Sequence, residues 1–173
     1  SGGTVSAQSV RGAGIGGGQY GTGGAITIND GTVNATGGYN SAGIGGGDTG
    51  AGGSQIVING GTVKATSGHG SGVALGAGRD KEGGKVTING GTVYANKSTD
   101  GSGDGIGWKV QLVSKPGSSG IIVAQAVSDQ ANLSGFNGII KQGNTYTVYG
   151  SANLETALEI KTGETLKIEN GKT

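Results

Sequence analysis

The stretch AITINDGTVNATGGYNSAGIGGG, residues 25–47, holds the pattern that decides the fold. Its first part returns as QIVINGGTVKATSG at 55–68 and as KVTINGGTVYANKS at 85–98. The threonine of the shared Gly-Thr-Val motif stands at 4, 32, 62 and 92, at intervals of 28, 30 and 30 residues. A fixed period of this size is the signature of a repeat architecture.

Each repeat contains three short segments in which apolar residues alternate with other residues, as at 26–28, 33–35 and 42–44. Alternation places the apolar side chains on one face of a strand. The segments are joined by Asn-Gly, Asn-Asp-Gly and glycine-rich corners, which favour the positive φ of a sharp turn. Asn-Gly between apolar runs also signals a β-hairpin. Hairpins, however, do not require the same residue types every 30 positions, whereas stacked coils do.

The repeat therefore predicts an all-β parallel β-helix with coils of about 30 residues and three short strands per coil. Right-handed winding is expected because parallel crossovers are almost always right-handed. Asn29, Asn59 and Asn89 are expected to form a ladder of hydrogen-bonded amides along one corner. The predicted inward columns are Ile26, Ile56, Val86; Ile28, Ile58, Ile88; Val33, Val63, Val93; Ala35, Ala65, Ala95; and Ile15, Ile44, Leu75, Ile106.

The chain divides into a glycine-rich repeat region, residues 1–109, and a region at 110–173 where the repeat breaks. We expect the second region to continue or cap the solenoid, with a separate domain as the alternative, because an open strand edge invites aggregation. SDQANLSGFNGI (128–139) predicts a loop or a short helix. NTYTVYGSANL, ALEIKTG and ETLKIENGKT, from 144 onward, predict strands. The whole is expected to be a fragment of a longer chain.

Composition excludes several classes of protein. The chain has 43 glycines in 173 residues but one proline, which excludes a collagen triple helix. Its net charge of +1 predicts no nucleic-acid partner. No apolar run approaches the roughly 20 residues of a membrane span, so no membrane insertion is expected. With no cysteine, disulfides, zinc–thiolate sites and thiol catalysis are excluded.

Two segments carry a resemblance to a known group of proteins. GGAITINDGTVNATGGYNSAGIGGG (23–47) and NTYTVYGSANLETALEIKTGETLKIENGKT (144–173) resemble segments of large cell-surface proteins of Gram-positive bacteria. The resemblance implies an extracellular location at the cell surface or wall and a role as a structural stalk or adhesin, with a host glycan or protein as partner. The ITINGGTV type of coil is more loosely similar to surface proteins with a polysaccharide-lyase-like β-helix, which implies carbohydrate binding.

Few aromatic residues are present, and four side chains are candidates for binding carbohydrate: Trp108, Tyr94, Tyr39 and His69. Aromatic rings stack on the apolar faces of sugars, while neighbouring polar groups bind the hydroxyls. Tyr39 and His69 stand 30 residues apart and so belong to the same corner of successive coils. The structural alternatives are a plain corner loop for Tyr39 and His69, and a plug that ends the glycine strand for Trp108.

DGSGDG (100–105) places oxygen ligands at alternate positions, as in a calcium loop. Asp100, Ser102 and Asp104 are therefore candidate calcium ligands, and calcium is the one cofactor considered. Gln111 stands where such a loop has its bidentate glutamate, so a solvated loop is the alternative. No catalytic residue is predicted. Arg79, Asp80, Lys81 and Glu82 keep a calcium-dependent lyase as an alternative, but the same four residues suit a surface corner.

Overall fold

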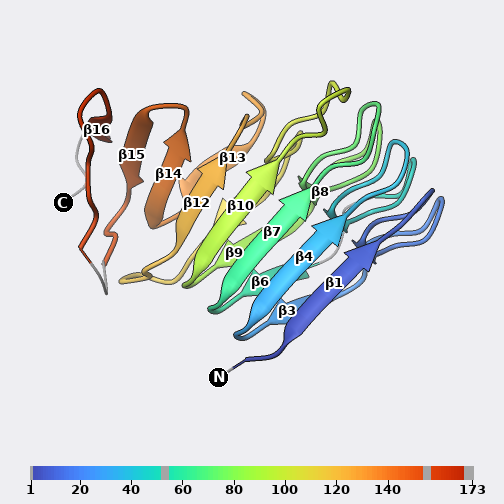
Figure 1. Ribbon diagram of the computed structural model, residues 1–173, viewed down its shortest axis with the longest axis horizontal. Helices are drawn as coiled ribbons and strands as arrows, with labels where there is room; N and C mark the ends of the chain where they lie inside the picture. The colour runs from blue at the N-terminus through green and yellow to red at the C-terminus, as the bar shows by residue number, and fades with distance from the viewer. Residues whose placement is uncertain (1, 52–54, 154–156, 170–173) are drawn as a thin grey trace.

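The computed structural model describes residues 2–51, 55–153 and 157–169, and within these ranges every regular element is a strand (Figure 1). No helix long and apolar enough to span a membrane occurs in the described residues. The strands are β1 (Thr4–Gln8), β2 (Ile15–Gly16), β3 (Ile26–Ile28), β4 (Thr32–Thr36), β5 (Ile44–Gly45), β6 (Gln55–Ile58), β7 (Thr62–Thr66), β8 (Leu75–Gly76), β9 (Lys85–Ile88), β10 (Thr92–Asn96), β11 (Gln111–Val113), β12 (Ile121–Ala124), β13 (Asn132–Gly135), β14 (Gly138–Gln142), β15 (Thr145–Tyr149) and β16 (Thr165–Ile168).

The strands form a parallel β-solenoid, which confirms the predicted fold class. An eight-stranded sheet has the order β1-β4-β7-β10-β12-β14-β15-β16, a five-stranded sheet the order β13-β11-β9-β6-β3, and a three-stranded sheet the order β2-β5-β8. In Figure 1 the near strands run upward and the chain returns behind them as the coils advance from right to left. This winding is right-handed, as expected for parallel crossovers.

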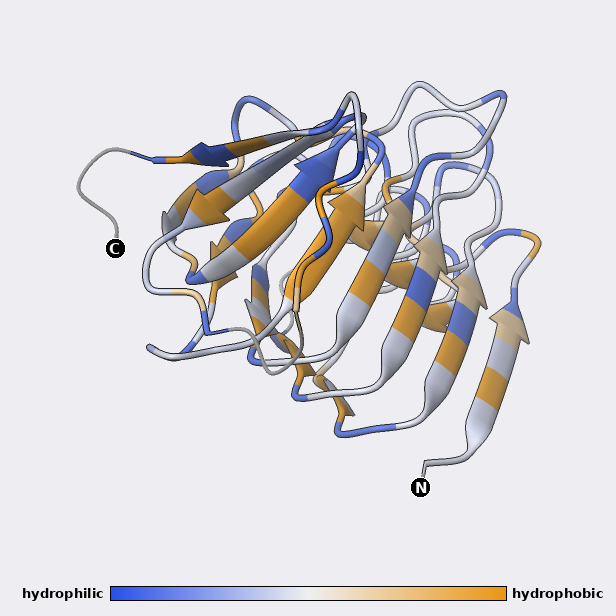
Figure 2. Ribbon diagram, turned by 60° about the vertical axis from the view of Figure 1, so that its left-hand side comes forward, coloured by the Kyte–Doolittle hydropathy of each residue, from blue (hydrophilic) through white to orange (hydrophobic). Residues whose placement is uncertain are grey.

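The register places equivalent residues of successive coils directly side by side. Ile26 pairs with Ile56, Val33 with Val63, and Ile44 with Leu75, as the predicted columns require. Figure 2 shows the resulting alternation of apolar and polar residues along the large sheet. The inward members in the central coils are fully buried, including Ile58, Val63, Leu75, Val86 and Ile88. Stacked β-branched side chains therefore fill the interior.

The predicted amide ladder is also present. The Asn59 side-chain amide donates to Asn29 Oδ1 at 2.8 Å, and the Asn89 amide donates to Asn59 Oδ1 at 2.8 Å. The backbone N–H of Lys115 then donates to Asn89 Oδ1 at 3.1 Å, which ends the ladder. Each of the two bonds joins the amides of successive coils, so the ladder links the coils along this exposed corner.

Parallel stacking continues past residue 109. Strand β11 pairs with β9, and β12 pairs with β10, so 110–124 form part of a further coil. Strands β13 and β14 then pair parallel with β11 and β12. Strand β15 runs antiparallel to β14, and β16 lies on β15. The buried ring of Phe136 belongs to the main core and lies 6.1 Å, between centroids, from the ring of Tyr149.

Two expectations for this region were wrong. Residues 132–135 within SDQANLSGFNGI form strand β13, because Leu133 packs against the core beneath β11; no helix forms there. Residues 157–161 of ALEIKTG form no strand. The alternation of apolar and polar residues gave a wrong prediction here, because a strand also needs the free edge of another strand to pair with. The last four residues of ETLKIENGKT, 170–173, lie outside the described residues.

The ion pair between Lys141 and Glu164 joins β14 to the start of β16, and we predict that it makes the stability of these strands depend on pH. Lys141 donates to Glu164, and this hydrogen bond holds the pKa of Glu164 below its ordinary value and raises the pKa of Lys141. A carboxylate with a lowered folded pKa stabilises above its unfolded pKa and loses that contribution as pH falls through the folded pKa. The lysine contribution is lost as pH rises through its raised pKa.

Hydrogen exchange along β16, corrected for intrinsic rates, checks this prediction. Protection should be constant near neutral pH and fall below about pH 4, where glutamates protonate. Glu164→Gln should give weaker but pH-independent protection over the acid range. An unchanged acid dependence in that variant would assign the effect to another group.

Candidate functional site

Two series of loops flank the short glycine strands and form a groove between them. The first loop column joins the large sheet to the glycine strands and comprises 9–14, 37–43, 67–74 and 97–105. The second loop column leaves those strands and comprises 17–25, 46–51, 77–84 and 107–110. Loops of successive coils lie side by side because the strands that carry them are paired.

A hollow opens where the second loop column shortens. Strand β8 ends at Gly76 and β9 begins only at Lys85, whereas β11 already begins at Gln111 after the bridge residue Ile106. The longer loop 77–84 therefore extends beyond the loop of the following coil, 107–110. Trp108 lies at this step, where its carbonyl accepts from Gly83 N–H at 2.9 Å.

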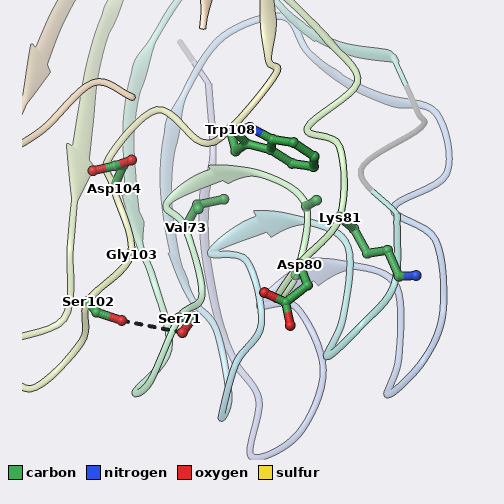
Figure 3. A pocket seen from close by; sticks show the side chains of 10 residues that line it. Ser71, Val73, Asp80, Lys81, Ser102, Gly103, Asp104 and Trp108 are labelled. Atoms are coloured by element: carbon green, nitrogen blue, oxygen red, sulfur yellow. Dashed lines mark hydrogen bonds between the residues drawn. The ribbon is translucent and has the colours of Figure 1, made fainter. Parts of the chain in front are cut away.

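We call this space the Trp108 hollow; it measures about 410 Å³, within the range of roughly 300–1,000 Å³ that ligand pockets occupy. Figure 3 shows Trp108 above Val73, with Asp104 and Ser102 on one side and Asp80 and Lys81 on the other. The lining residues are Ser71, Val73, Ala77, Gly78, Asp80, Lys81, Ser102, Gly103, Asp104 and Trp108.

The indole of Trp108 is held in place from one side. Lys109 Nζ lies 4.5 Å from the ring centroid and 2.6 Å from Glu82 Oε1. Trp108 is nevertheless 41% exposed, so much of its surface is open to the hollow and to solvent. A positioned aromatic ring at the wall of a hollow is a platform on which a flat apolar surface can stack.

The polar groups of the Trp108 hollow are of both signs. Ser71 Oγ and Ser102 Oγ lie 3.3 Å apart across the two coils. Partial burial raises the pKa of Asp104 above its ordinary value, and the nearby charge of Asp129 adds to this. Hydroxyls and carboxylates near an aromatic ring can exchange hydrogen bonds with a polyhydroxylated ligand.

The other three predicted carbohydrate residues lie elsewhere. Tyr39 and His69 line a separate hollow of about 430 Å³ in the first loop column, together with Thr99, as their spacing predicts. Tyr94 lies on the outer face of β10, between Lys64 of β7 and Val123 of β12. The structure therefore brings Tyr39 and His69 together and leaves Tyr94 apart from every described hollow.

The candidate calcium residues are divided between two surroundings. Asp100 lies 3.0 Å from His69 Nδ1, and a hydrogen bond from Thr99 followed by the His69 interaction lowers the pKa of Asp100. Ser102 and Asp104 line the Trp108 hollow instead. Within the described ranges, no group of three or more His, Asp or Glu side chains could hold a metal ion. Calcium binding stays a prediction.

Sequence reasoning missed a third hollow, of about 450 Å³, which we call the Tyr20 hollow. Its lining residues are Val10, Arg11, Gln19, Tyr20, Tyr39 and Asp48. Tyr20 is 69% exposed and Tyr39 is 59% exposed, so two aromatic rings border this space. Tyr20 has a φ of 64°, and Thr49 and Asp80, which stand at the same place in the next two coils, also have positive φ. An alignment of the repeats at this corner would have shown Tyr20 as the aromatic residue in the same column as Thr49 and Asp80.

The fold and its loop-lined groove define the chain as a β-solenoid repeat protein. The β-helix repeat family matches it over residues 1–19, 26–48, 56–78 and 86–107. These segments together cover half of the chain, which therefore belongs to this family. Each matched segment contains paired strands of the solenoid and the loop of the first loop column that borders the groove. Comparison with curated proteins and with solved structures gives no significant match.

Proposed function

We propose that the chain is a non-catalytic binding module of an extracellular bacterial surface protein, and that it binds polysaccharide at the Trp108 hollow. The observation that carries the proposal is the positioned, 41% exposed indole at the wall of a hollow that also presents carboxylate and hydroxyl groups. The surface location is supported by the resemblance of residues 23–47 and 144–173 to segments of Gram-positive surface proteins.

Several contacts favour binding over catalysis. His69, the one histidine of the chain, is ion-paired with Asp100, and both side chains are about two-thirds exposed. Arg79, one of the four residues that keep the lyase alternative, lies 3.6 Å from Asp48 and 3.8 Å from Asp80. A general base must be free to take a proton from the substrate, and a paired guanidinium is not.

A structural stalk is the second candidate function. The continuous Asn29–Asn59–Asn89 ladder and the unbroken apolar columns would make a stiff spacer between other domains. A stalk that also adheres to a surface uses both features, so the two functions are compatible. A stalk alone would show no saturable binding to any glycan.

The first test of the proposal is binding of the purified chain to a panel of soluble plant, mucin and bacterial polysaccharides. We expect saturable binding to a neutral polymer and a loss of at least about 10-fold in affinity for Trp108→Ala, because an aromatic anchor in a pocket often contributes 1.4 kcal/mol or more. Tyr94→Ala is the matched control and should bind like the wild type. Wild-type binding by Trp108→Ala would refute the site.

The same titrations in calcium and in chelator test the calcium prediction separately. If the side chains of the Trp108 hollow bind the glycan without a metal ion, the affinity should be the same in calcium and in chelator. Loss of binding in chelator would place a metal ion in the site, with Ser102 and Asp104 as its nearest candidate ligands. Incubation with acidic polysaccharides tests the lyase alternative, which requires product release that Arg79→Ala abolishes.

A further inference from the structure

The Tyr20 hollow and the Trp108 hollow occupy the same groove, two coils apart. Each has one wall from the first loop column and one from the second: Arg11 and Tyr39 face Tyr20 and Asp48, and Ser102 and Asp104 face Asp80 and Lys81. Two coil steps correspond to about 10 Å at the usual spacing of paired strands. That separation exceeds one sugar ring and is within reach of a short oligosaccharide.

Arg79 lies between the two hollows and contacts both. Its backbone N–H donates to the Asn40 carbonyl at 2.9 Å, which joins the two loop columns at this point. Its guanidinium approaches Asp48 of the Tyr20 hollow at 3.6 Å and Asp80 of the Trp108 hollow at 3.8 Å. Arg79 therefore links the two hollows, each of which has an aromatic side chain in its wall.

The residues at this junction keep unused hydrogen-bonding capacity. Asp48 is only 9% exposed, and its Oδ1 atom makes no hydrogen bond among the described residues, although it lies 3.6 Å from the Arg79 guanidinium. Asn40 Nδ2 and Arg79 Nε likewise make no hydrogen bond among these residues. A buried polar atom without a hydrogen bond destabilises the folded protein. Such groups call for an explanation other than stability, and a ligand rich in hydroxyls beside Asp48 supplies one.

We infer that the Tyr20 hollow is a second subsite for the polymer that occupies the Trp108 hollow, so that one glycan chain lies along the solenoid axis. This inference rests on the proposed function. Both hollows carry acidic and basic groups, which suits a neutral polymer rather than an acidic one. Aromatic walls at two points favour sugars whose equatorial substituents leave flat apolar faces, as in β-linked glucans.

The experiment uses soluble mixed-linkage β-glucan and its oligosaccharides of two and of eight sugar units as probes. The variants are Trp108→Ala, the double variant Tyr20→Ala with Tyr39→Ala, and the combination of all three. Each substituted residue is at least 41% exposed, so the fold should be preserved, which thermal unfolding checks. Tyr94→Ala, a tyrosine outside the groove, is the control.

We expect the polymer and the eight-unit oligosaccharide to bind the wild type at least about 10-fold tighter than the two-unit one, since only a long ligand engages both subsites. The tyrosine variant should lose this gain, and the triple variant should lose binding. If Trp108→Ala weakens binding while the tyrosine variant matches the wild type, the second subsite is refuted and the proposed function stands. Binding that ignores Trp108 refutes the proposed site and this inference together. Failure of the wild type to bind β-glucan refutes the inferred polymer class, and the wider panel then decides the proposed function.

Discussion

Gly45→Ala should unfold the solenoid or reduce its free energy of unfolding by about 4 kcal/mol or more, an exceptional loss for one methyl group. Gly45 has a φ of 136°, which side-chain-bearing residues rarely adopt. A Cβ atom built there would lie 1.8 Å from the carbonyl oxygen of Gly76 in the next coil. The overlap is with backbone, so it can be relieved only by separating β5 from β8.

Gly18→Ala is the matched control. Gly18 lies in the same glycine-rich block type, has no positive φ, and has no atom within 4 Å of a built Cβ. Urea unfolding of the two variants should therefore differ widely, with Gly18→Ala close to the wild type. A Gly45→Ala protein as stable as the wild type would show that the coils do not pack as closely as described.

Ile58→Ala should lower the free energy of unfolding by about 2–5 kcal/mol, the usual range for deleting a buried isoleucine. Ile58 is fully buried in the middle of its column, between Ile28 and Ile88. Backbone pairing fixes the neighbouring coils, so they cannot move in to fill the space left by the side chain. The free energy lost to the remaining cavity should therefore add in full to the loss of apolar burial.

Val57 provides the comparison within the same strand. It precedes Ile58 on β6, points to the opposite face and is only partly buried. Val57→Ala should cost less than about 1 kcal/mol, because little apolar surface is returned to water. Equal losses for the two variants in urea or thermal unfolding would contradict the inward and outward assignment along β6.

The sheets and the loops of this fold differ in how far they vary between coils. The sheets supply a stiff core, while the loops that flank the glycine strands vary from coil to coil without disturbing it. Tyr20, Thr49 and Asp80 stand at one corner of successive coils and differ completely in chemistry. Binding sites on such a scaffold arise from loop variation, and the fold alone does not specify the ligand.

The coil could be predicted from the amino-acid pattern alone. A period of about 30 residues, alternation within each short segment and glycine or asparagine at the corners were enough to predict the columns of Ile58, Val63 and Leu75 and the Asn29–Asn59–Asn89 ladder. The physical reason is that stacked coils repeat one local environment. Each position is therefore specified by its own residue and by identical neighbours one period away.

The pairing of the C-terminal strands and the positions of the hollows became known only from the folded structure. Strand β13 and the antiparallel β15 depend on which edge is left unpaired, which no local pattern records. The Trp108 hollow exists because loop 107–110 is shorter than loop 77–84, and the Tyr20 hollow is lined by residues of both loop columns, including Tyr39 and Asp48. These features depend on differences between coils, and their geometry follows only once the coils are stacked.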